Sequence, residues 1–518
     1  MSKTASPALF ELIKSLTKSE KRYFKIYASR HTIGEENNGV RIFDFIDQQK
    51  EFNEEEIYTN FEGEAFLNQF PITKNRLYEQ IISALDAFHS SKNLDAQLYK
   101  MLHSINILYS KGLYDHAINE LKKAKRLAKK HNKIAILLQL ANEEKRIIET
   151  QGYQKANTKS IDKHKNETYE LTSQYNFYNE LWSIKSKLFI QLNQYGQARS
   201  PEEVTEYTKL FEQFKKITPP EKITFENQYL INHLKSAYFF GILRNEDSLN
   251  ALIDNLNHFK KNPDKINENP NQYFSILTNI IHLESKFGNS RAIHTYLNEL
   301  KSFPHQLKSS LTEDLTIKLF SSINSIELKV LNQEGSFEKA TLLSKVIKEG
   351  FEKYNGEITP FRKAYLAFNM SIAFFGNADF NQSLKWINMI LNNKELDQKE
   401  DILSFAHLLN LLIHFELKND NLLPYAIKNT KRFLTKRKRA FKFETLFLKN
   451  ITKISNAQNK YEIEDLLLNV DEEIKALKND PFESVAFEYF DFHLWLISKV
   501  KNKSFQEIKR EAYLMKIA

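Results

Sequence analysis

The chain has 518 residues, too many for one compact core, so we expect several domains or a repeat array. It is 42% hydrophobic and 27% charged, a composition that excludes an intrinsically disordered chain. The formal net charge of +9 is modest for this length, and it permits an acidic or nucleic-acid partner without requiring one.

Cysteine is absent, which excludes disulfides, thiolate metal sites and a cysteine nucleophile. Only 12 Gly and 11 Pro occur, whereas a sheet protein of this size needs many turns that contain these residues. Helix interiors tolerate neither residue, so the composition predicts an all-α chain. Residues 1–7 lack the apolar core of a signal peptide, and no run of about 18 apolar residues occurs, so we expect a cytoplasmic protein with no membrane span.

Residues 1–92 are predicted to form a small helical N-terminal module. A capping box that begins at Thr17 opens one helix, and Asn53, which precedes three glutamates, caps another. Pro71 is predicted to break the chain, and Thr73 to cap the helix that follows. The module is expected to be a plain helical cap for the rest of the chain.

The start of that last helix suggests an alternative role for the module. Lys74 and Arg76 open it, and the second helix of a helix-turn-helix DNA reader also begins with polar and basic residues. The glutamates at residues 54–64 lie just before it and would repel phosphates. DNA reading therefore stays an alternative to the capping role.

From residue 93 to residue 478 the pattern becomes long apolar helices in pairs. Turn signatures rich in Gly and Asn return at intervals of about 40 to 49 residues. Both residues tolerate the left-handed backbone that often ends a helix, so their regular return indicates stacked helical hairpins. Proline-bearing segments at 218–220 and 262–270 are predicted to be loops between helices, with hinges as the alternative. The turn signatures lie at Gly112, Gly152, Gly196, Asn245, Gly288, Gly335, Asn377 and Asn419.

One turn carries a fuller pattern, in which a small residue closes the first helix, an aromatic follows two positions later, and small residues recur beyond it. Its residues are Gly112, Tyr114, Ala117, Leu121 and Ala124. The turn at Gly335 repeats the pattern in part, with Phe337 and Ala340. This pattern resembles that of the tetratricopeptide family over about residues 95–440. The resemblance implies an α-solenoid of tetratricopeptide-like helical hairpins with lengthened helices, and it transfers no functional residue.

Residues 479–518 are predicted to form C-terminal aromatic capping helices. Asp480 is predicted to cap a helix whose first turn holds Pro481. The preferred interpretation of its aromatic side chains is a core that closes the array, and the alternative is an exposed docking strip. These side chains are Phe487, Tyr489, Phe490, Phe492 and Trp495.

Two acid-free basic stretches are the strongest charge signals, at residues 122–133 and 428–442. If the second is one unbroken helix, a single stripe contains Lys428, Lys431, Arg432, Arg439 and Lys442. A turn near Arg437 is the alternative. Each stretch is interpreted first as a solvated face, then as a phosphate-facing surface or a site for an acidic protein.

The chain lacks a phosphate-binding loop, a His-Glu-x-x-His zinc motif and a Gly-x-Ser-x-Gly nucleophile elbow. We therefore expect no enzyme activity, cofactor or metal, and interpret the chain as a scaffold or adaptor that binds a protein or peptide on a helical-repeat surface. The alternative is a regulator that binds nucleic acid or ribonucleoprotein through the basic helices and a helix-turn-helix-like N-terminal module. Tyr109, Lys235 and Tyr238 lie on candidate inner helices. The candidate binding residues are Lys428, Lys431, Arg432, Lys436, Arg437, Lys438, Arg439, Lys442, Lys74 and Arg76.

Overall fold

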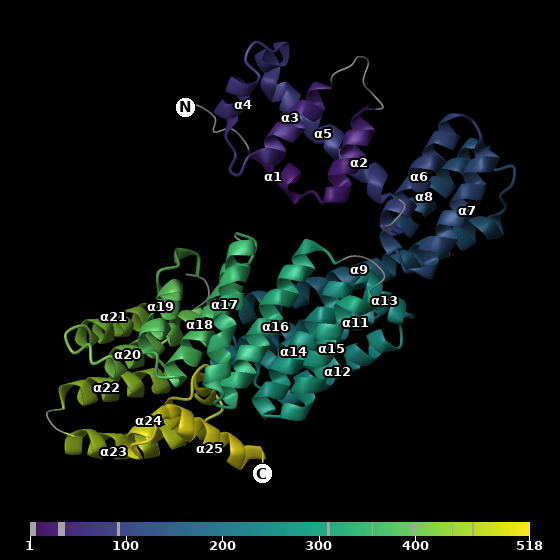
Figure 1. Cartoon of the computed structure of the whole chain (residues 1–518). Coiled ribbons are helices and arrows are strands. Elements are labelled where there is room, and N and C mark those ends of the chain that lie inside the picture. The colour runs from purple at the N-terminus through teal and green to yellow at the C-terminus, as the bar shows by residue number, and fades with distance from the viewer. Residues whose placement is uncertain are drawn as a thin grey trace. The chain divides into compact units, whose positions relative to one another are not determined.

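The structure is a computed structural model, and its described residues are entirely helical and irregular. They form 25 α-helices and three short 3-10 helices and contain no strand (Figure 1). The predicted all-α class is confirmed. Among these residues, no helix is both long and apolar enough to cross a membrane. The structure describes residues 7–29, 37–90, 94–307, 311–354, 356–396, 400–437, 439–457 and 460–517.

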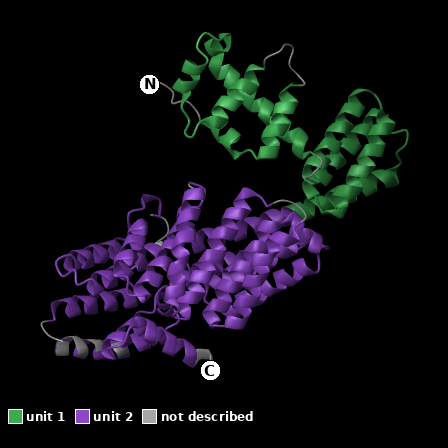
Figure 2. Ribbon diagram, viewed as in Figure 1, with its two compact units in different colours: residues 1–175 green, residues 176–518 purple. Residues whose placement is uncertain are grey.

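The chain divides into two compact units, residues 1–175 and residues 176–518 (Figure 2). The boundary falls inside one long helix, α9 (Thr158–Tyr195), and so within the predicted repeat array. The boundaries predicted after residues 92 and 478 stay predictions.

Unit 1 begins with a helical module that has its own hydrophobic core, centred on Phe24, Phe43 and Ile81. The predicted capping box is present, because Thr17 N donates to the Glu20 carboxylate at 2.7 Å and Glu20 N donates to Thr17 Oγ1 at 3.3 Å. The elements are α1 (Ala8–Ser15), α2 (Lys18–Ser29), α3 (Asn38–Gln48), α4 (Glu54–Asn60), η1 (Ala65–Gln69) and α5 (Phe70–His89).

The start of α5 differs from the prediction. The helix begins at Phe70 and holds Pro71 in its first turn, where the missing N–H of proline would have no helical partner anyway. Thr73 lies inside the helix, and its hydroxyl donates to the Gln69 carbonyl at 3.3 Å. The prediction that Pro71 ends an element and Thr73 caps the next one is therefore wrong.

A second core in unit 1 joins the helices around the clearest turn signature. Gly112 adopts a φ of +74°, and Leu113 N donates back to the Leu108 carbonyl at 3.0 Å, which closes the helix end. The small residues Ala117 and Ala124 are fully buried, so their helix approaches its neighbours closely. The elements are α6 (Leu94–Ser110), α7 (Tyr114–Lys130) and α8 (Ile134–Thr150).

Unit 2 is built mainly from consecutive helix pairs: α11 packs on α12, α14 on α15, α16 on α17, α18 on α19 and α20 on α21. The first helices of successive pairs also contact each other, from α14 through α16 and α18 to α20. The elements in the first half are α10 (Pro201–Lys215), α11 (Phe225–Gly241), α12 (Asn245–Lys260), α13 (Pro263–Glu268), α14 (Pro270–Phe287), α15 (Ser290–Gln306), α16 (Glu313–Gln333) and α17 (Phe337–Lys353). Those in the second half are α18 (Pro360–Gly376), α19 (Phe380–Leu391), η2 (Lys394–Leu396), α20 (Glu400–Glu416), α21 (Leu423–Lys436), α22 (Lys442–Asn456), α23 (Lys460–Asn479), η3 (Ser484–Glu488), α24 (Phe492–Val500) and α25 (Phe505–Ile517).

Six of the eight predicted turns fall between packed helix pairs, whereas Gly152 and Gly196 lie in the connections from α8 to α9 and from α9 to α10. The residue with left-handed backbone is not always the one expected. Gly288 adopts it as predicted, with a φ of +71°. Between α11 and α12 it is Leu243, and Asn245 instead begins α12. Between α18 and α19 it is Ala378. The proline-bearing segment at 262–270 is not a plain loop, since it contains α13.

The aromatic C-terminal segment is buried, as the preferred interpretation expects, but it is not one helix. η3 ends at Glu488, and α24 begins at Phe492 after a break. Phe492 and Trp495 are 1% and 3% exposed in the larger core of unit 2. The single helix predicted to follow Asp480 is therefore wrong, because Asp480 caps only a turn and a 3-10 segment.

Candidate functional site

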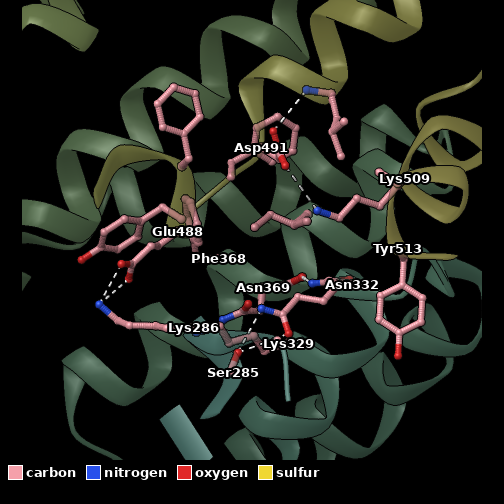
Figure 3. A pocket seen from close by; sticks show the side chains of 18 of the residues that line it. Ser285, Lys286, Lys329, Asn332, Phe368, Asn369, Glu488, Asp491, Lys509 and Tyr513 are labelled. Atoms are coloured by element: carbon pink, nitrogen blue, oxygen red, sulfur yellow. Dashed lines mark hydrogen bonds and ion pairs between the residues drawn. The ribbon is translucent and has the colours of Figure 1, made fainter. Parts of the chain in front are cut away.

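A cavity in unit 2 lies between paired helices and the C-terminal segment. Its volume is about 490 Å³, and α14, α16 and α18 line one side while residues 484–513 line the other (Figure 3). A second cavity of about 410 Å³ shares several of these walls. The residues common to both are Ser285, Lys286, Lys329, Tyr365, Glu488 and Tyr489.

Capping and turn residues determine where the helices that carry the cavity residues begin or end. α14 ends at the left-handed Gly288, which places Lys286 in its last turn, where a cation is favourable beside the helix dipole. α16 begins at a Thr312 cap whose side chain accepts from Leu315 N, and Lys329 follows near its other end. α18 begins at Thr359, whose side chain accepts from the N–H of Arg362.

Lys286 is fully engaged by its neighbours. Its ammonium donates to Glu488 at 2.7 Å and to the Gln197 side chain, and it lies 4.8 Å from the centre of the Phe240 ring. Burial lowers the pKa of Lys286, and the Glu488 carboxylate raises it in part. The dashed lines between Lys286 and Glu488 in Figure 3 mark this pair, which joins α14 to the C-terminal segment.

Lys329 differs from Lys286, because its ammonium forms no hydrogen bond or ion pair with any described residue. Burial lowers the pKa of Lys329, and the nearby Glu488 carboxylate offsets only part of this effect. The adjacent His282 has a pKa well below its usual value, owing to burial and then to the charges of Lys329 and Lys286. An incoming anion would relieve this local excess of positive charge.

Two amides continue the polar wall from α16 to α18. Asn332 Nδ2 donates to the Asn369 carbonyl at 2.9 Å, and Asn369 Nδ2 donates to the Tyr365 carbonyl at 2.8 Å. The Oδ1 atom of Asn332 is buried and has no hydrogen-bond partner among the described residues. A buried amide oxygen in this state is an acceptor for a ligand N–H or a water.

The C-terminal segment is held in place by its own polar contacts. Asp491 caps α24 by accepting from Leu494 N at 3.2 Å, and its carboxylate lies 3.9 Å from Lys478 and 3.7 Å from Lys509. Figure 3 shows Asp491 near Lys509. Arg510 Nε donates to the Gly335 carbonyl at 3.1 Å, which docks α25 on the turn between α16 and α17.

A buried ion cluster elsewhere in unit 2 was not predicted from the sequence. The Arg199 side chain is 2% exposed and binds Glu444, at the start of α22, and Glu483, which lies 3.1 Å away. Glu483 also accepts from Lys442 N at 3.2 Å and from Phe443 N at 2.9 Å. These contacts tie the α9–α10 loop to α22 and to the C-terminal segment.

Four of the predicted basic residues lie on the exposed face of α21: Lys428, Lys431, Arg432 and Lys436. None of the four forms an ion pair with a described residue. The helix ends at Lys436, so of the two alternatives the turn near Arg437 is the one present. The Arg437 guanidinium lies 4.8 Å from the centre of the Phe433 ring. Lys438 lies outside the described residues.

The predicted unbroken stripe through residue 442 is wrong, because the turn after α21 redirects the chain. Arg439 is 3% exposed and ion-paired with Asp401, so its charge is neutralised inside the protein. Lys442 begins α22, and its ammonium lies 3.8 Å from Asp480.

The remaining predicted residues are divided between contacts within the fold and exposed positions. Lys74 is ion-paired with Glu54 at 2.7 Å, whereas Arg76 is exposed on α5. Tyr109 bonds Thr150 at 2.7 Å. Tyr238 is buried and stacked on an aromatic ring, and Lys235 is half-buried on α11.

Comparisons with protein-family models, with curated proteins and with solved structures find no match to this chain.

Proposed function

We propose that unit 2 is a tetratricopeptide-like α-solenoid that binds a peptide segment of a partner protein in its cavity, as a scaffold or adaptor without a chemical step. Support for the architecture comes from the consecutive helix pairs and from the turns at Gly288 and Gly335. Arrays of this kind present one helix of each pair to a shared inner surface, which suits extended or helical peptides.

The single observation that carries the proposal is the unpaired ammonium of Lys329 inside a cavity of about 490 Å³. Lys286 is engaged by Glu488, and Lys478 and Lys509 share Asp491. Among the described residues that line this cavity, Lys329 is therefore the one cation that forms no ion pair. The cavity thus matches a ligand with one carboxylate better than a polyphosphate chain.

The other walls fit the remainder of a peptide. The unpartnered Oδ1 of Asn332 offers an acceptor to a backbone N–H, and Phe337, Phe368 and Phe505 supply apolar and aromatic surface. A charge-assisted hydrogen bond contributes about 1.5–3 kcal/mol when it is shielded from water. We therefore propose an acidic side chain or a terminal carboxylate at Lys329, with neighbouring peptide residues against these rings.

Selection of a random peptide library against the whole chain tests this function. We expect enriched sequences to carry Asp or Glu, and their affinity to fall about 10- to 150-fold in Lys329→Met, the range that corresponds to loss of one charge-assisted bond. The control is Lys345→Met on α17, whose side chain is 84% exposed and lies outside the cavity. The proposal fails if no peptide is enriched, or if enriched peptides bind both variants and the parent chain equally.

A further inference from the structure

One side of α21 is buried and the other carries a regular exposed series. The exposed residues Tyr425, Lys428, Arg432 and Lys436 are spaced at i, i+3, i+7 and i+11, so they lie in one stripe about 80° wide. The buried side chains point to the opposite side and join the larger core of unit 2. They are Leu423, Ile427 and Leu434, and the Thr430 side chain is buried on the same side.

This stripe is both cationic and uncompensated. α21 contains no acidic residue, and none of the three cations of the stripe is ion-paired with a described residue. They line a shallow, open depression together with Lys431 and Thr435. Tyr425, one turn before Lys428, is 71% exposed, which is high for an aromatic side chain of a folded protein.

The other predicted basic stretch, on α7 and the turn after it, has more of its cations in ion pairs. Lys125 is paired with Glu144, Lys129 approaches Glu167 at 3.7 Å, and Lys133 is paired at 2.7 Å. Its unpaired cations, which include Lys122 and Lys130, have no comparably exposed aromatic residue on their helix. The exposed aromatic residue beside unpaired cations therefore distinguishes α21 from α7.

We propose that the exposed stripe of α21 binds the backbone of a single-stranded nucleic acid, on a surface separate from the cavity. Its cations recur about every 6 Å along the helix, which allows one strand to meet them in succession. An exposed ring at one end of a cationic depression is the combination that holds single strands, because phosphates pair with the cations while a base stacks on the ring. An acidic polypeptide would use the cations but would leave Tyr425 without a role.

Fluorescence anisotropy with a labelled 20-nucleotide thymidine oligomer tests the proposal on the whole chain. We expect binding at 50 mM salt that weakens steeply by 200 mM. The triple variant Lys428→Gln, Arg432→Gln, Lys436→Gln should lose about 100-fold in affinity at 50 mM salt, and its log–log salt slope should fall by about 2. Tyr425→Ala should lose about 5- to 100-fold with the slope unchanged, since stacking releases no counterions.

The control variant carries the same charge change on another exposed face: Lys122→Gln, Arg126→Gln, Lys130→Gln on α7. It should bind as the parent chain does, and circular dichroism should show every variant to be folded. Equal losses in the two triple variants would overturn the proposal, because binding would then follow net charge alone. Absence of oligomer binding at 50 mM salt would also overturn it, and binding of poly-glutamate in that case would assign the face to an acidic polypeptide.

Discussion

Arg199 is held by two acids far away in sequence, with its side chain almost completely removed from water. Desolvation of a guanidinium is costly, and the paired carboxylates of Glu444 and Glu483 offset that cost only while all three are in place. Burial raises the pKa of Glu444, against the lowering effect of Arg199. Removing the cation would thus leave two buried carboxylates close together.

Arg199→Met is expected to lower the free energy of unfolding of unit 2 by about 3–5 kcal/mol, since one partner of a buried ion pair is removed. Urea unfolding followed by circular dichroism measures the change. Arg244→Met serves as the matched control, because the Arg244 side chain is 57% exposed and its pair with Asp247 is local. A change in Arg199→Met no larger than in the control would contradict a structural role for the cluster.

Burial lowers the pKa of several histidines, and His233 is the clearest case. Its ring stacks between Phe189 and Tyr229, and burial lowers its pKa to about 4. Because the unfolded chain binds this proton near pH 6.5, the free energy of unfolding should fall as the pH falls from about 6.5 toward 4. The contribution of His233 to this loss is about 2 kcal/mol at pH 5.

His233→Phe should therefore remove about 2 kcal/mol of the loss in stability between pH 7 and pH 5. Urea unfolding of unit 2 at the two pH values gives the difference directly. Substitution of the exposed His305 by Gln provides the control. An unchanged pH dependence in His233→Phe would show that His233 is solvated when folded.

At the scale of elements, close helix approach depends on residues whose role is visible only in three dimensions. Gly376 ends α18, and a Cβ atom added there would overlap the ring of Phe337 on α17. The glycine thus allows the ring to sit directly on the α18 backbone. Phe337 is fully buried and also stacks on Phe505 of α25.

Gly376→Ala is expected to destabilise unit 2 by about 1–3 kcal/mol, because the added methyl group overpacks the site. The double variant with Phe337→Leu should destabilise less than the sum of the two single changes, since the smaller side chain makes room. Thermal unfolding of the parent chain, the two single variants and the double variant measures this coupling. Additive effects would mean that the ring and the glycine do not share one packing site.

The helices themselves were well predicted, because turn chemistry and capping are local properties. The Thr17 capping box and the Gly112 turn needed only neighbouring residues to be recognised. The cap predicted at Thr73 is a local error, because Pro71 fits the first turn of a helix that begins at Phe70. The other errors arise where distant contacts decide the outcome. At Arg439 an ion pair with Asp401 on α20 removes a predicted surface cation, and at Tyr489 packing on Phe405 accompanies a break in the predicted helix.

At the scale of the whole molecule, the cavity could not be predicted from the sequence, because its walls come from segments about 200 residues apart. One signal was available: Lys286 and Lys329 are 43 residues apart, which matches the recurring turn interval. The two lysines lie on α14 and α16, the first helices of successive pairs, which contact each other. Glu488, which distinguishes the paired lysine from the unpaired one, follows no such spacing.

Because the chain divides into two compact units, we expect two separable unfolding transitions. Calorimetry of the whole chain should resolve them, and Arg199→Met should shift only the transition of unit 2. Trypsin digestion with mass spectrometry at temperatures between the two midpoints identifies which unit has unfolded. A single transition that moves as a whole in the variant would show that the units unfold together.

The most direct test of the proposed peptide site is a double-mutant cycle between Lys329 and the acidic residue of a selected peptide. Titration calorimetry would compare the parent chain and Lys329→Met, each with the peptide and with its Asp→Asn or Glu→Gln form. We predict a coupling energy of about 1.5–3 kcal/mol, because the two charges meet in a cavity shielded from water. Coupling below about 0.3 kcal/mol would contradict the account, because peptide and lysine would then not be in contact.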